Sequence, residues 1–159
     1  MRSDSQSRRG FLMQTVGLAA GGGLLAVFAA RPVSATPDDL RAAIKQVVGG
    51  SAVRTGKVTL DLPPLVENGN TVPLTVVVDS PMTATDYVRA IHVFNEKNPQ
   101  VNVADFTLGP RAGKAKISLR MKLRDSQRIV AVAELSDGSF WSGDADVIVT
   151  IAACIEEVR

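Results

Sequence analysis

Alternating apolar and polar residues recur along most of the chain after residue 56 and predict a β protein. The clearest example is residues 116–124, where Ile117, Leu119, Met121 and Leu123 alternate with polar side chains. A period of two is typical of an antiparallel strand with one buried face. Turn sequences separate this stretch from similar strand-rich stretches at 57–63, 71–79, 87–95, 101–109, 128–135 and 144–154. We therefore expect an all-β fold, an immunoglobulin-like antiparallel β-sandwich of about seven strands.

One segment ahead of these strands has a helical pattern instead. Thr36 is a good N-cap, Pro37 suits the first helical position, and two aspartates follow in the first turn. Gly49 and Gly50 end the pattern. The residues that share one apolar face are Leu40, Ile44, Val47 and Val48. The sequence thus predicts one short N-terminal helix packed on the outside of the sandwich.

The first 35 residues have the pattern of an export signal. Arg8 and Arg9 precede an apolar run, residues 11–30, and the small residues Val33 and Ala35 form a cleavage site before the helix. Adjacent arginines indicate the twin-arginine type. We expect a cleaved signal peptide at 1–35 and a periplasmic mature domain at 36–159. A retained membrane anchor is the alternative, which the glycines of the apolar run disfavour.

The charge balance changes once the signal peptide is set aside. The full chain carries 18 Lys and Arg against 16 Asp and Glu, but four of the basic residues and only one acidic residue belong to 1–35. The mature chain keeps 14 basic and 15 acidic side chains, a net charge of −1. This balance gives no reason to expect nucleic acid or, after cleavage, a membrane surface as a partner.

Cys154 is the only cysteine, and His92 is the only histidine. One thiol allows no disulfide within the chain, and this pair is too few for a Cys/His zinc site. In an oxidising compartment such a thiol is buried, paired with another molecule, or used for its reactivity. The alternation in the last strand directs Val147, Val149 and Ile151 to the core, which leaves Cys154 on the less buried side and open to other proteins.

The other candidate residues favour structural roles. We expect His92 to be an edge or core-rim histidine hydrogen-bonded to backbone rather than a general base. Asp144 and Asp146 are interpreted as a solvated turn rather than a cation site. The loop at 109–116 lacks the phosphate-loop pattern. Phe140 and Trp141 are expected in the core or at an interface. No nucleophile has a recognisable base, so an independent enzyme is disfavoured.

Three stretches of the chain, residues 67–83, 87–113 and 132–141, have the pattern of a known family. They resemble SoxY, the sulfur-carrying subunit of the periplasmic thiosulfate-oxidising Sox system, and with the twin-arginine leader the similarity extends over nearly the whole mature chain. The resemblance implies an immunoglobulin-like sandwich that forms a heterodimer with a second β-sandwich subunit, SoxZ. It also implies a carrier without catalytic residues, metal or cofactor, in which a cysteine near the C-terminus holds the sulfur.

By position, Cys154 corresponds to that sulfur-attachment residue, within a C-terminal arm at 152–159. The resemblance implies further partners: a c-type cytochrome complex that couples thiosulfate to the thiol, a hydrolase that releases sulfate, and a sulfane dehydrogenase. The family's usual ending is Gly-Gly-Cys-Gly-Gly, whereas Cys154 here lies between two alanines and Ile155, followed by Glu156 and Glu157. This arm is stiffer and more acidic, and its carboxylates disfavour the thiolate and repel anionic thiosulfate.

Three interpretations remain open at this point. The chain is a Sox carrier with a variant arm, or a SoxY-like carrier that serves different machinery. Alternatively, it is a non-catalytic binding or structural module that acts through the surface of its sandwich. A disulfide-linked homodimer through Cys154 is a further species that each carrier interpretation permits.

Overall fold

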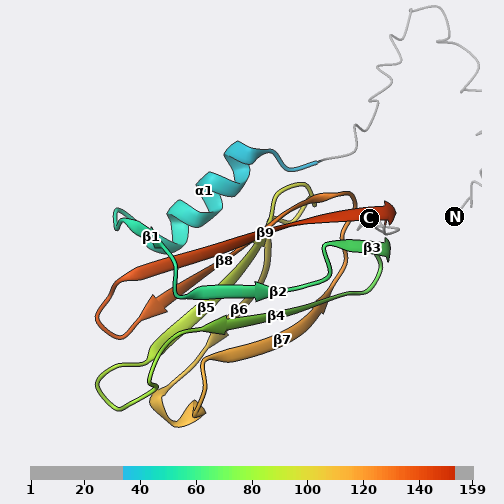
Figure 1. The fold of residues 1–159 in the computed structure, drawn as a ribbon. Coiled ribbons are helices and arrows are strands. Elements are labelled where there is room, and N and C mark those ends of the chain that lie inside the picture. The colour runs from blue at the N-terminus through green and yellow to red at the C-terminus, as the bar shows by residue number, and fades with distance from the viewer. Residues whose placement is uncertain (1–33, 153–159) are drawn as a thin grey trace, which may run out of the picture. The chain divides into compact units, whose positions relative to one another are not determined.

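The computed structural model describes residues 34–152, and these residues form a two-sheet β-sandwich with one α-helix (Figure 1). The predicted fold class is therefore confirmed. Each of the seven predicted strands is present, and two short additional strands, β1 and β3, raise the number to nine in this part of the chain. The elements are α1 (Pro37–Val48), β1 (Val53–Thr55), β2 (Val58–Asp61), β3 (Leu65–Asn68), β4 (Val72–Val78), β5 (Val88–Asn95), β6 (Asn102–Thr107), the 3₁₀ turn η1 (Pro110–Ala112), β7 (Lys116–Met121), β8 (Gln127–Leu135) and β9 (Phe140–Ile151).

The larger sheet has the strand order β1-β9-β8-β5-β6, with β3 also paired to β9, and the smaller sheet has the order β2-β4-β7. The alternation read from the sequence sorts side chains between the inside and outside of this sandwich. In β4, for example, Val72, Leu74, Val76 and Val78 are buried while the residues between them are exposed or half-buried. The inner faces of both sheets together form the main core, which is the arrangement expected of packed sheets.

Helix α1 begins and ends where the sequence predicts. The Thr36 hydroxyl accepts a hydrogen bond from the Asp39 backbone N–H, and the Asp39 carboxylate accepts one in return from the Thr36 backbone N–H, which together form a capping box. The apolar face of α1 packs on the outer face of the larger sheet, and Figure 1 shows the helix above β8 and β9. The buried members of this second cluster are Leu40, Val48, Phe94, Val130, Val132 and Phe140.

The two short strands were not predicted because neither has a repeating pattern of its own. β1 and β3 both pair in parallel with β9, β1 at its beginning and β3 at its end. Between them the chain leaves the edge of the larger sheet and forms β2 in the smaller sheet. At this crossing a Cβ atom on Gly143 would lie 2.2 Å from the carbonyl oxygen of Val58. A glycine at 143 therefore lets the two sheets approach closely.

Candidate functional site

The predicted sulfur-attachment residue, Cys154, lies outside the described residues, but the structure shows what holds the base of the arm. β9 ends at Ile151, where Asn68 of β3 is its partner in the parallel ladder. The Ile151 carbonyl accepts a hydrogen bond of 2.9 Å from the Gly69 N–H, and the Thr150 hydroxyl donates one of 3.2 Å to the Glu67 carbonyl. The arm therefore begins from a strand that a neighbouring strand and turn hold in place.

Three large apolar side chains are exposed at the same end of β9. Leu65 of β3 is 57% exposed, its ladder partner Ile148 is 58% exposed, and Ile151 is 65% exposed. The sequence assigned Ile151 to the core face with Val147 and Val149. That prediction is right for Val147, which is buried, and wrong for Ile151, which is exposed where β9 ends.

A row of cations on the smaller sheet leads to the base of the arm. We call it the basic strip; it consists of Lys114, Lys116, Arg120 and Lys122, all exposed and lying in or beside β7. No ion pair involves any of the four within residues 34–152. The Gly69 carbonyl accepts a hydrogen bond of 2.8 Å from the Leu123 N–H, while the Gly69 N–H bonds Ile151. One residue, Gly69, thus links the C-terminal side of β7 to the end of β9.

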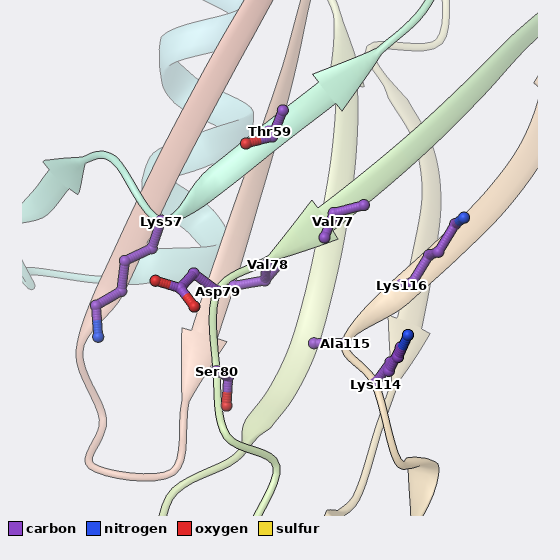
Figure 2. Close-up of a pocket in the computed structure, with 9 residues that line it drawn as sticks. All are labelled: Lys57, Thr59, Val77, Val78, Asp79, Ser80, Lys114, Ala115 and Lys116. Carbon is purple, nitrogen blue, oxygen red and sulfur yellow. The ribbon is translucent and has the colours of Figure 1, made fainter.

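The far end of the basic strip borders a pocket of about 460 Å³ (Figure 2). Lys114 and Lys116 lie on one side of it with their ammonium groups pointing the same way, and Lys57 lies on the other side beside Asp79. Val77, which is 40% exposed, lies between them. Lys57 has a positive φ of 56°, a conformation that is uncommon for a residue with a side chain. Its ammonium group lies 5.1 Å from the Trp141 ring centroid.

His92 is bonded to a side chain, not to backbone as expected, and β5 is an interior strand rather than an edge. Its Nδ1 lies 2.6 Å from the Asp105 carboxylate, and the other Asp105 oxygen accepts a hydrogen bond of 2.9 Å from the Asn102 amide. Burial by itself raises the pKa of Asp105, but the hydrogen bonds from His92 and Asn102 outweigh it and lower that pKa overall. No nucleophilic side chain is bonded to His92 in the described part of the chain.

Asp144 and Asp146 belong to β9, so the predicted solvated turn is wrong. Both face Arg128 of β8, at 3.7 Å and 3.3 Å from its Nε. The hydrogen bond to Asp146, with the charges of both aspartates, raises the pKa of Arg128. One cation, Arg128, thus pairs with both carboxylates across the strand pair.

The remaining candidates have structural roles. Phe140 is buried under α1, and Trp141 packs partly against the main core while its Nε1 donates to the Ser139 hydroxyl at 3.2 Å. Within residues 34–152 there is no group of three or more side chains able to hold a metal ion. The same part of the chain contains no helix of the length and apolarity needed to span a membrane.

Sequence reasoning missed the basic strip as a feature of the arm's surroundings. The alternation in residues 116–124 already predicts that Arg120 and Lys122 face solvent. It contains no signal that β7 ends next to β9, because that proximity depends on Gly69 and on the pairing of β3 with β9.

Comparison with solved structures identifies similar folds. The sulfur carrier protein SoxY from Chlorobium limicola f thiosulfatophilum is 29% identical, with a TM-score of 0.62, over 72% of this chain and 98% of that one. A superoxide reductase (neelaredoxin) from Ignicoccus hospitalis is 18% identical, with a TM-score of 0.54, over 74% and 95% of the two chains. A putative superoxide reductase from Thermotoga maritima is 21% identical, with a TM-score of 0.53, over 61% and 93%. The two superoxide reductases share only the fold at this identity.

A comparison with curated proteins found no match. The family model described as sulfur oxidation protein SoxY matches residues 44–154, a range that contains every strand of the sandwich and has Cys154 as its last residue. This match covers well over half of the chain and agrees with the structural similarity to SoxY from Chlorobium. The chain therefore belongs to the SoxY family of sulfur oxidation proteins.

Proposed function

We propose that this protein is a periplasmic sulfur carrier that binds thiosulfate-derived sulfur covalently on Cys154 and presents it to partner enzymes. The observation that carries the proposal is the family match, which extends to the only thiol of the chain. Cys154 then follows a strand end that Asn68 and Gly69 hold to the sandwich. A fixed base with the thiol three residues beyond Ile151 suits a residue that other proteins must reach.

The chemistry requires only the thiol of this chain. The Cys154 thiolate and thiosulfate form a sulfur–sulfur bond and release two electrons, which the proposed c-type cytochrome partner accepts. Hydrolysis of the resulting thiosulfonate then releases sulfate and two protons and leaves a persulfide on Cys154. Both steps belong to partner enzymes, so the carrier itself is proposed to have no catalytic residue and no cofactor beyond the covalent sulfur adduct.

A second subunit is part of the proposal. The exposed side chains of Leu65 and its ladder partner Ile148 form an apolar pair near the base of the arm, and Ile151 is exposed on the opposite face of β9. Such groups on soluble proteins often mark contacts with other proteins. They support a heterodimer with a SoxZ-like subunit, and we extend the proposal to contacts with the cytochrome, sulfate-releasing hydrolase and sulfane dehydrogenase components. The twin-arginine signal supports export to the periplasm.

Intact-mass spectrometry of protein purified from the periplasm of thiosulfate-grown cells tests the proposal. We expect mass additions of sulfane sulfur or thiosulfonate that reductant removes and that Cys154→Ser abolishes without loss of folding. An unmodified thiol under all growth conditions would contradict the proposal. If thiosulfate oxidation continued in a Cys154→Ser strain without another carrier, the carrier would serve different machinery.

A further inference from the structure

The acidic arm creates an electrostatic problem for the proposed function. Glu156 and Glu157 follow Cys154 closely. Nearby negative charge disfavours the thiolate, which is the reactive form, and repels an anionic substrate. A carrier with this arm needs positive charge near the thiol, and Arg159 is the only basic residue in the arm itself.

The basic strip has that charge, and it begins beside the base of the arm. Gly69 bonds both Ile151 and Leu123, so Lys122 and the end of β9 are separated by about two strand spacings, roughly 10 Å. Beyond Lys122, the strip continues through Arg120 to Lys116. All these side chains are exposed, and none forms an ion pair among the described residues.

The lengths of the two segments also match. At about 3.3 Å per residue, an extended chain reaches roughly 13 Å from Ala152 to Glu156 and roughly 17 Å to Glu157. On the same scale, the part of the strip between Lys122 and Lys116 is roughly 20 Å long. The arm's carboxylates are therefore within reach of Lys122 and Arg120, and their side chains extend that reach towards Lys116.

From this match of charge, length and position we infer that the arm of the same chain docks on the basic strip, with Glu156 and Glu157 paired to Lys122, Arg120 and Lys116. The inference rests on the proposed function only for its consequence, namely that docking offsets the arm's negative charge and leaves Cys154 beside cations. Cations near a thiol favour the thiolate and attract anions such as thiosulfate.

Zero-length carbodiimide crosslinking of the purified protein tests the docking directly, because it joins a carboxylate to an amine only when the two are in contact. We expect amide bonds between Glu156 or Glu157 and Lys122 or Lys116, within monomers, that weaken in high salt. The exposed ion pair of Lys97 with Asp125, 3.1 Å apart, is the internal positive control.

Charge reversal makes the test specific. Arg120→Glu with Lys122→Glu should remove most of the arm crosslinks, whereas the same change of charge at Lys45 and Arg111, both exposed and outside the strip, should leave them unchanged. Adding Glu156→Lys and Glu157→Lys to the reversed strip should restore crosslinking with the opposite polarity, from the arm lysines to the new strip carboxylates.

The reactivity of the thiol is an independent readout. At neutral pH, the strip reversal should slow alkylation of Cys154 by iodoacetamide by about threefold to tenfold relative to the Lys45 and Arg111 control, since a pKa rise of one unit reduces the thiolate about tenfold. Urea unfolding of each variant confirms that the sandwich is intact.

Three results would overturn the inference. They are arm crosslinks to other faces, crosslinks that occur only between two chains, and a Lys97–Asp125 crosslink with none from the arm. If the arm gave no crosslinks but Cys154 carried sulfur adducts, the docking would be contradicted and the proposed function would stand. If the arm crosslinked to the strip but Cys154 never carried a sulfur adduct, the proposed function would be contradicted and the docking would stand.

Discussion

The outer faces of the two sheets differ, although the same strand alternation produces both. Outside the larger sheet, Phe94, Val132 and Phe140 are buried because α1 covers them. Outside the smaller sheet, β4 and β7 present hydroxyls and cations, and the Thr75 and Ser118 hydroxyls lie 3.0 Å apart. The comparison indicates that the covered face adds to folding stability, while the open face remains free for contacts with other molecules.

Removing the largest side chain of the covered face should have the greatest effect on stability. We expect Phe94→Ala to lower the free energy of unfolding by about 3–5 kcal/mol, since Phe94 is fully buried under α1. The matched change on the open face, Val77→Ala, should alter it by less than about 0.5 kcal/mol. Urea unfolding measures both, and similar losses for the two variants would contradict the distinction between the faces.

A substitution where the two sheets approach each other, at Gly143, should have the next largest effect on stability. A methyl group in Gly143→Ala would collide with the Val58 backbone, which is less able to move than a side chain. We expect a loss of roughly 1–3 kcal/mol from the resulting strain. Gly138→Ala at the β8–β9 turn is an informative contrast, because no atom lies within 4 Å of its added Cβ and only its positive φ of 78° opposes the change. Thermal or urea unfolding of both variants distinguishes packing from backbone strain.

Loss of the N-cap of α1 should lower the free energy of unfolding by a smaller amount. Thr36→Ala removes the hydroxyl that accepts the Asp39 N–H, and such losses cost about 1 kcal/mol. Thr36→Ser keeps an acceptor and should cost less. If circular dichroism and urea unfolding showed no difference between the two variants, the cap would contribute nothing to holding α1 on the larger sheet.

The smallest predicted effect is a pH dependence at Asp105. Its pKa is lower in the folded state than the ordinary value of 3.8, because the hydrogen bonds from His92 and Asn102 outweigh burial. The stability that Asp105 contributes is therefore fully present above pH 3.8 and is lost as the pH falls through its lower folded pKa. The difference in unfolding free energy between wild type and Asp105→Asn should shrink in that range.

The control for this titration is Asp61→Asn on β2. Asp61 is exposed on the open face, and its carboxylate has no hydrogen bond to any residue in the described part of the chain. If the difference in unfolding free energy between wild type and Asp61→Asn shrank at low pH as much as the difference for Asp105→Asn, the His92 and Asn102 contacts would be excluded as the cause.

The pattern along the sequence was sufficient to predict the fold class, α1 with its cap, and seven of the strands. These are local properties, because a buried face requires alternation in a strand and a helix end requires particular residues. β1 and β3 were missed because each is short and depends on β9, a strand far away in the chain. His92 was assigned the wrong partner for the same reason, since Asp105 reaches it only through the pairing of β5 with β6.

For the candidate site, the sequence by itself determined the single thiol, the two carboxylates that follow it and the solvent-facing cations of residues 116–124. Only the tertiary structure decided that the Lys122 end of the basic strip lies beside the end of β9, and that Ile151 is exposed. The physical reason is that residue type and spacing set which groups face outward on one strand. Which strands end together depends on backbone hydrogen bonds between distant segments, here those of Gly69 to Ile151 and Leu123.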